Sequence, residues 1–344
     1  MRTLRLLVLL SLALTGAACS GRGGNKELFG GRELPPPKEP PAVPARKDEP
    51  VDPALLAAAR QQLTAAAGAE DPVLRENAME AVRRLKDPAA RDIIRKGLED
   101  PMRIVRFRAA LAAGEHRLAE ARPQLEAMVD VNDPHLRIAV IFALHRLGVT
   151  ENSHDLEQTA TNPEPGVRAD TALVLGLLGE PSALKILKVL ARDSNPVVRQ
   201  VAWEAMWRLG DQSRVDELVG LTISKYADDQ MLGLLALAAP RNETVREHVR
   251  TGLTSDHTET SLVAARAMGQ LNSDEGYGVA LKGAQSGEGR HRFLAALAFG
   301  AIGRTDAQPV LRNLLKDKDQ RVRVAAAAAV LEIASAGGAG LAGG

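Results

Sequence analysis

The sequence predicts an all-α protein, an α-solenoid (α-α superhelix) of about nine helical hairpins with a 31-residue repeat. Three observations predict this fold: an Arg recurs at intervals of 31 residues, a helix-start signal precedes it, and a helix-stop Gly follows it. A fixed period of this length, kept without insertions, is typical of stacked helical repeats. The recurring residues are Arg75, Arg106, Arg137, Arg168, Arg199, Arg292 and Arg323, and Gln230 and Ser261 occupy the same register.

Each repeat begins with a helix-capping residue four positions before the register position of the Arg. These residues are Asp71, Asp133, Glu164, Asn195, Glu288 and Asp319, and Pro follows four of them. An Asp or Asn cap with Pro at the first helical position marks a helix start. Small or apolar residues then return three, four, six and seven positions after the Arg, which is helical spacing. The first helix of each repeat is therefore amphipathic.

The stop signal lies eleven residues after the Arg. Gly occupies this position in four repeats, at Gly148, Gly179, Gly210 and Gly303. Gly suits the left-handed conformation that ends many helices. A shorter second helix is expected next, anchored by an apolar residue nineteen positions after the Arg, such as Ile94 or Leu187.

The repeats are expected to fill residues 52–335. The helix expected over residues 53–66 has no partner helix before it. Its Leu63 has the spacing of a second-helix anchor, so the helix looks like a capping half-repeat. The last first helix begins near Arg323, and residues 336–344 form a Gly-rich tail that we expect to be disordered.

Within this pattern, the segment from Asn195-Pro-Val-Val-Arg199 to Leu209-Gly210 resembles the HEAT-like repeats of phycobilisome lyases. Residues 319–330 are similar to the same unit. The resemblance spans about residues 52–334 and implies a helical solenoid. It implies little about activity, because that family consists mostly of interaction scaffolds.

The first nineteen residues predict export. Arg2 and Arg5 precede an apolar run and then small residues before Cys19, which is the layout of a secretory signal peptide over residues 1–18. The segment resembles a bacterial lipoprotein signal, which implies acylation of Cys19, the only Cys in the chain. Cleavage with soluble release is the alternative. Ser20 after the Cys implies the outer membrane, on the periplasmic side.

Residues 19–51 are expected to form a disordered, Pro-rich linker, because they contain almost no large apolar side chains. In the whole chain, 44 Lys and Arg nearly balance 43 Asp and Glu, which argues against nucleic-acid binding. We expect a monomer held at the membrane by its lipid anchor.

The recurring Arg allows two interpretations. Seven guanidinium groups in one register could form a rail that binds anions. The interpretation that we favour is structural: each Arg lies near a carboxylate of its own or the neighbouring repeat and forms a hydrogen-bond ladder between repeats.

The partner-binding hypothesis rests on the second helices, which are expected to line the inner, concave wall. Their exposed registers change sign along the chain, which is also what a solvated face shows. Trp203 shares its register with core residues, whereas Trp207 shares its register mostly with small or polar residues and is expected to be partly exposed. Looser packing would also explain Trp207. The proposed partner-binding residues are Lys185, Lys188, Arg192, Trp207, Val219 and Ile223.

Catalysis is not indicated by any motif. HEAT-like metal hydroxylases carry repeated His-Glu dipeptides, and this chain has only the reversed order, in Glu115-His116 and Glu247-His248. No cofactor or metal site is expected. The sequence favours a non-enzymatic protein-interaction scaffold, tethered to the membrane of the bacterial envelope, that binds an envelope protein or peptide on its concave face. The alternative is a periplasmic enzyme or enzyme-accessory subunit.

Overall fold

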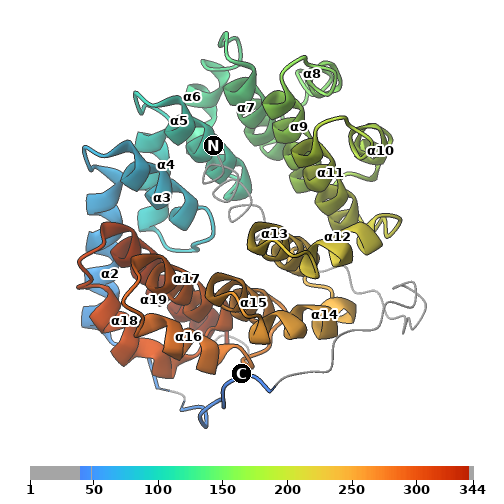
Figure 1. Ribbon diagram of the computed structural model, residues 1–344. Helices are drawn as coiled ribbons and strands as arrows, with labels where there is room; N and C mark the ends of the chain where they lie inside the picture. Colours follow the sequence, from blue (N-terminus) through green and yellow to red (C-terminus); the bar gives the residue numbers. More distant parts are fainter. Residues whose placement is uncertain (1–38, 48, 341–344) are drawn as a thin grey trace. The chain divides into compact units, whose positions relative to one another are not determined.

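The computed structural model describes residues 39–47 and 49–340, with side chains as far as residue 336. Every regular element in these residues is a helix, so the predicted all-α fold is confirmed (Figure 1). The predicted signal peptide and the predicted acylation of Cys19 lie outside the described residues. Among the described residues, none of the helices has the length and hydropathy that a membrane span requires.

The nine first helices begin 31 residues apart, at positions 72, 103, 134, 165, 196, 227, 258, 289 and 320. This spacing confirms the predicted repeat length. They are α3 (Pro72–Val82), α5 (Arg103–Glu115), α7 (Pro134–Arg146), α9 (Pro165–Leu178), α11 (Pro196–Arg208), α13 (Ala227–Ala238), α15 (Thr258–Gln270), α17 (Gly289–Ile302) and α19 (Gln320–Gly340).

A shorter helix follows each first helix up to α17. These second helices are α4 (Ala89–Gly97), α6 (Arg122–Glu126), α8 (Asp155–Thr159), α10 (Leu184–Leu190), α12 (Val215–Thr222), α14 (Arg246–Thr251), α16 (Tyr277–Ala284) and α18 (Gln308–Leu314). Short 3-10 turns are η1 (Ala119–Ala121), η2 (Pro181–Ala183), η3 (Glu243–Val245), η4 (Gly252–Thr254) and η5 (Thr305–Ala307). The helix α2 (Pro53–Ala67) precedes the first complete repeat.

The helix starts follow the predicted capping chemistry. The side chain of Asp71 accepts a hydrogen bond from the backbone N–H of Val73 at 2.9 Å, and that of Asn195 accepts one from Val197 at 2.9 Å. These bonds satisfy a backbone donor that the helix itself leaves without a partner. Pro at the first helical position, as in Pro72 and Pro196, has no such donor to satisfy.

The helix stops share one backbone conformation. Gly148, Gly179, Gly210 and Gly303 all have positive φ angles, between 73° and 86°, so the predicted left-handed stop is confirmed. The three positive-φ residues other than Gly that the structure describes occupy the same register, eleven residues after the Arg position. They are Arg117 (φ 48°), Arg241 (φ 56°) and Asn272 (φ 57°). Seven repeats therefore share this conformation, with or without a side chain, whereas Lys86 in the same register does not adopt it.

The chain divides into two compact units. Unit 2 contains residues 70–83 and 88–218, and thus α3 to α11. Of the described residues, unit 1 contains 39–47, 49–69, 84–87 and 219–340. The division at Leu218 and Val219 falls inside α12, next to the repeat in which Gln230 replaces the Arg.

Within unit 2, the first helices lie on the inner side of the arc. Figure 1 shows α9 and α11 on this side, and α8 and α10 on the outer side. The prediction that second helices line the inner wall is therefore wrong. The physical reason is close packing of the first helices: a Cβ added to Gly176 of α9 would lie 2.9 Å from the Cα of Ala205 in α11.

Unit 1 is completed by α2, which packs against α19. The repeat of α19 has no second helix of its own in the described residues, and α2 has no first helix of its own. Leu55, Ala59, Leu63 and Ala66 form the buried face of α2. The predicted half-repeat is thus not an isolated cap, because it supplies a packing partner to the last first helix.

The described part of the expected linker lies along unit 1. Residues 39–47 and 49–51 form no helix or strand, yet their backbone is hydrogen-bonded to η5 and α18. Lys47 N–H donates to Asp306 and Glu49 N–H donates to Thr305 Oγ1 at 3.0 Å, while Gln308 Nε2 donates to the Pro50 carbonyl at 3.1 Å. We call residues 39–47 and 49–52 the N-terminal strap. At the other end, α19 continues to Gly340, past the expected boundary at residue 335.

Candidate functional site

The recurring Arg forms a ladder between successive repeats. Arg168 donates from Nε and Nη2 to the two carboxylate oxygens of Asp193, at 2.6 and 2.8 Å. Asp193 precedes the next first helix, and its carbonyl accepts a hydrogen bond of 2.7 Å from Arg199, the next Arg in register. Each such Asp therefore connects two consecutive Arg residues.

The same geometry occurs at both ends of the chain. Arg75 binds Asp100 in unit 2 at 2.6 and 3.0 Å, and Arg292 binds Asp317 in unit 1 at 2.6 and 2.9 Å. Arg106 and Arg323 then donate to the carbonyls of Asp100 and Asp317. Arg137 pairs instead with Asp155. These contacts support the structural interpretation of the Arg register rather than an anion-binding rail.

The ladder stabilises its carboxylates in the charged form. Hydrogen bonds from Arg168 and Arg292 lower the pKa of Asp193 and Asp317, respectively, against the opposing effect of burial. The hydrogen bond to Asp193 likewise raises the pKa of Arg168. Charge-assisted, bidentate pairs of this kind are stronger than neutral hydrogen bonds.

The ladder carboxylate was not identified from the sequence, although a signal was present. The capping residue lies four positions before the Arg of its own repeat. The Asp that pairs with an Arg lies 25 positions after it and six before the next Arg in register, at Asp100, Asp193 and Asp317. Of the two repeats without the Arg, the one with Gln230 keeps the pattern in neutral form. Gln230 Nε2 donates to the Ser224 carbonyl at 2.7 Å, and Ser255 Oγ donates to Gln230 Oε1 at 3.2 Å.

The proposed partner-binding residues do not form one exposed surface. Trp207 and Val219 are each 3% exposed and are unable to anchor a partner, so these two assignments are wrong. Trp207 lies eight residues after Arg199, in the register where first helices approach one another, and small residues there reflect close packing rather than exposure. Trp203 is half-buried, and its indole N–H donates to the Ala191 carbonyl at 3.2 Å.

The remaining residues of that set are exposed. Lys185, Lys188 and Arg192 belong to unit 2, on α10 and the turn after it, and Lys188 pairs with Asp211 at 3.0 Å. Ile223 is 50% exposed and belongs to unit 1. Because α10 lies on the outer side of its unit (Figure 1), the basic residues would face a partner there and not on the inner side.

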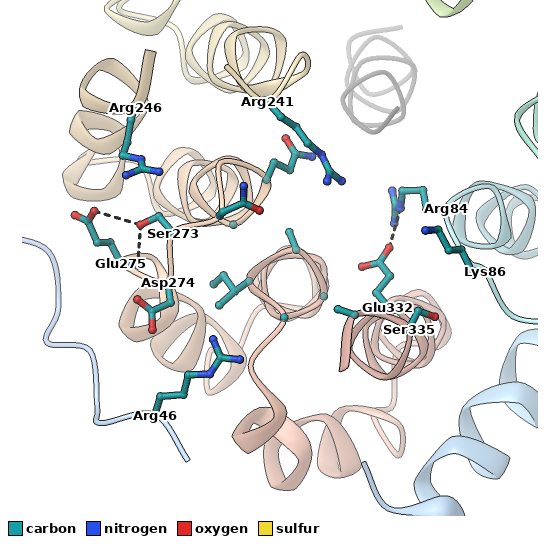
Figure 2. A pocket seen from close by; sticks show the side chains of 18 residues that line it. Arg46, Arg84, Lys86, Arg241, Arg246, Ser273, Asp274, Glu275, Glu332 and Ser335 are labelled. Carbon is teal, nitrogen blue, oxygen red and sulfur yellow. Dashed lines mark hydrogen bonds and ion pairs between the residues drawn. The ribbon is translucent and has the colours of Figure 1, made fainter. Parts of the chain in front are cut away.

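The site that the structure presents instead is a cleft of about 830 Å³ in unit 1. It lies at the carboxyl-terminal ends of α15, α17 and α19, and Arg241, α14, residues 84–86 and the N-terminal strap complete it. We call it the basic cleft. Figure 2 shows its cations, which come from separate segments of the chain: Arg46, Arg84, Lys86, Arg241 and Arg246.

Cations outnumber carboxylates in the basic cleft, five to three. Each carboxylate already pairs with an Arg: Glu332 with Arg84 at 2.9 Å, Asp274 with Arg304, and Glu275 with Arg250. Within the described residues, neither Arg241 nor Lys86 forms an ion pair, and both side chains are exposed. The cleft therefore carries an excess of positive charge.

Two further features distinguish the lining. Gln270 is 4% exposed, and its amide Nε2 and Oε1 have no hydrogen-bond partner in the described part of the chain. Arg241 and Asn272 hold left-handed conformations where most other repeats have Gly. That conformation costs a residue with a Cβ about 1–2 kcal/mol, and such strain is concentrated at functional sites. The sequence signal for this site was overlooked: Lys86, Arg241 and Asn272 stand in the register where other repeats have the helix-stop Gly.

The N-terminal strap forms one wall of the basic cleft and is held by a buried Arg. Arg304, which is 1% exposed, donates to the Pro44 carbonyl at 3.0 Å and to Asp306 at 2.6 Å, and its guanidinium lies 4.1 Å from the Tyr277 ring centroid. Burial raises the pKa of Tyr277 to about 12. Arg304 thereby fixes the segment that carries Arg46 into the cleft.

Potential metal ligands do not gather in the described residues, where no group of three or more His, Cys, Asp or Glu has suitable positions. Of the two reversed dipeptides, His116 Nε2 lies 2.9 Å from the Val82 carbonyl, and His248 is buried.

Several solved structures are similar to parts of this chain. Human deoxyhypusine hydroxylase in complex with glycerol is 18% identical, with 82% of this chain and 96% of that chain covered and a TM-score of 0.35. The CpcE–CpcF complex of phycocyanin lyase from Nostoc sp. PCC7120 is 19% identical, with 71% and 97% covered and a TM-score of 0.42. Kap121p is 14% identical, with 82% and 38% covered and a TM-score of 0.34.

No curated protein sequence matches the chain. The family model for HEAT repeats matches residues 60–145, 153–238 and 279–338, which is more than half of the chain. With nine first helices in a strict 31-residue register, the protein belongs to the HEAT repeat family.

Proposed function

We propose that this protein is a non-enzymatic interaction scaffold, tethered at the periplasmic side of the bacterial envelope through acylated Cys19, and that it binds another envelope protein in the basic cleft. The observation that carries the proposal is the cleft itself, about 830 Å³ in volume and lined by more cations than carboxylates. Clefts of this size are typical of ligand sites.

The repeat architecture supports a binding role. Stacked hairpins hold their connecting turns in fixed positions, so residues far apart in sequence contribute to one surface. Lys86 and Arg241 are separated by 155 residues of sequence and line the same cleft. Each carboxylate of the cleft is paired with an Arg residue.

Spatially selective cross-linking tests the binding role. A photo-reactive amino acid replaces Ser335, which lines the cleft, in the full chain, and an identical replacement of exposed Gln61 on α2 is the control. In envelopes of the producing cells, we expect a discrete protein adduct from position 335 and none from position 61. Equal adducts from both positions, or none from either, would contradict the proposed site.

Fractionation tests the tether. If the lipid on Cys19 holds the protein, the Cys19→Ser variant should move from the membrane fraction to the soluble periplasmic fraction. Retention of that variant in the membrane would contradict the lipid anchor.

Metal analysis of the purified protein tests the enzymatic alternative. Stoichiometric iron, together with no cross-linked protein, would contradict the scaffold.

A further inference from the structure

We infer that the ligand of the basic cleft is an extended, carboxylate-rich peptide segment of the partner. This inference rests on the proposed function and specifies its ligand. It is argued from three features of unit 1: unpaired cations, one buried amide without a partner, and the dimensions of the cleft.

The first feature is charge. Arg241 and Lys86 occupy equivalent positions in their repeats, eleven residues after the Arg or Gln of the register, and project from different segments toward the cleft (Figure 2). Neither is neutralised by a carboxylate in the described residues. A guanidinium matches the planar fork of a carboxylate, with which it forms two parallel hydrogen bonds. Asp and Glu side chains are therefore suited to this site.

The second feature is Gln270. It is more than nine-tenths buried and lines the cleft, and both its donor and its acceptor lack partners in the part of the chain that the structure describes. Burial of an unsatisfied amide is costly. Both atoms are inaccessible to solvent in this structure, so a ligand reaches them only when the Gln270 side chain rotates into the cleft. A peptide group then offers an acceptor and a donor at once, which satisfies both atoms. A phosphate oxygen would satisfy the donor alone.

The third feature is size. A cleft of about 830 Å³ is far larger than one inorganic anion needs, and its cations are distributed around the lining rather than gathered at one point (Figure 2). Ser273 and Asn272 add short polar groups between the charged ones. A chain segment with several carboxylates fits this distribution better than a single phosphate group does.

In the test, the full-length protein in detergent is titrated into a labelled peptide, and binding is measured by fluorescence anisotropy. The probe is a labelled ten-residue peptide of alternating Glu and Gly. Comparison probes are the same peptide with Gln in place of Glu, and a peptide with one phosphoserine among Gln and Gly. We expect saturable binding of the Glu peptide, weakened by added salt, and at least tenfold weaker binding of the Gln peptide.

Three variants locate the binding. Arg241→Gln should weaken the Glu peptide at least fivefold and reduce the dependence of affinity on salt. Gln270→Met should weaken binding and leave the salt dependence unchanged, because it removes hydrogen bonds and no charge. Arg117→Gln is the matched control, since Arg117 has the same register and a positive φ angle but belongs to unit 2. The affinity of Arg117→Gln for the Glu peptide should stay within twofold of that of the wild type.

Each outcome decides the inference. Tighter binding of the phosphoserine peptide than of the Glu peptide would overturn it in favour of a phosphate ligand. Equal loss with Arg117→Gln and Arg241→Gln would show nonspecific charge attraction and also overturn it. If position 335 still cross-links an envelope protein while the Glu peptide does not bind, the ligand assignment fails and the scaffold remains.

Discussion

Units 1 and 2 use the same helix-stop position in different ways. In unit 2, three of the four positive-φ stops are Gly, at Gly148, Gly179 and Gly210, and the backbone conformation is adopted without strain. In unit 1, Arg241 and Asn272 adopt it with side chains, and both line the basic cleft. Gly303 of unit 1 also has a positive φ angle and lines the cleft. The proposed binding role would account for the side chains at Arg241 and Asn272.

The largest expected effect concerns the contact that only unit 1 has, the packing of α2 on α19. Leu63 on α2 is 1% exposed. Leu63→Ala should lower the free energy of unfolding of unit 1 by about 2–5 kcal/mol, measured by hydrogen exchange in α19. The same measurement on Gln61→Ala, at an exposed position of α2, should show little change. Unchanged protection of α19 in Leu63→Ala would contradict the role of α2.

The next effect concerns the ladder, which both units share. Arg168→Ala in unit 2 and Arg292→Ala in unit 1 each leave a largely buried Asp carboxylate without its bidentate partner. We expect each to destabilise its own unit by about 1–3 kcal/mol. The exposed pair of Arg122 and Glu126 provides a control, because Arg122→Ala should cost less than about 1 kcal/mol. If either Arg variant lost binding of the Glu peptide while its stability stayed unchanged, the anion-rail interpretation would be restored.

A pH-dependent effect should be specific to unit 2. His135 on α7 lies 2.6 Å from Asp170 on α9, and this hydrogen bond raises the pKa of His135 above 6.5. A raised pKa means that protonation stabilises the fold. The contribution is therefore complete below pH 6.5 and is lost as pH rises through the raised pKa.

His135→Gln removes this titration. The difference in unfolding free energy between wild type and His135→Gln should thus be largest near about pH 6 and shrink toward about pH 9. Urea unfolding followed across that range measures it. A difference that does not change with pH would show that the His135–Asp170 contact does not contribute through charge.

The sequence was sufficient for the repeat, because cap, Arg and stop residues report local backbone geometry. The start of α11 at Pro196 and the left-handed turn at Gly210 follow from neighbours along the chain. It was insufficient for what depends on contacts between distant segments. The packing of α2 on α19 and the approach of Lys86 and Arg241 to one cleft are set by tertiary packing.

Trp207 illustrates the same limit. Its register is occupied by small residues because neighbouring first helices approach there, and composition alone does not distinguish a close contact from an exposed site. Conversely, the unusual residues at the stop position were visible in the sequence. Their meaning required the structure, which shows that Arg241 lines a cleft and that Arg117 belongs to the other unit.

The central claim is that Arg241 is retained for binding although it strains the backbone. The direct measurement is the stability and Glu-peptide affinity of Arg241→Gly beside Arg117→Gly. Both variants should be more stable than wild type by up to about 1 kcal/mol, because Gly adopts positive φ without strain. Only Arg241→Gly should lose affinity. A destabilised Arg241→Gly that still binds the peptide as wild type does would contradict the account.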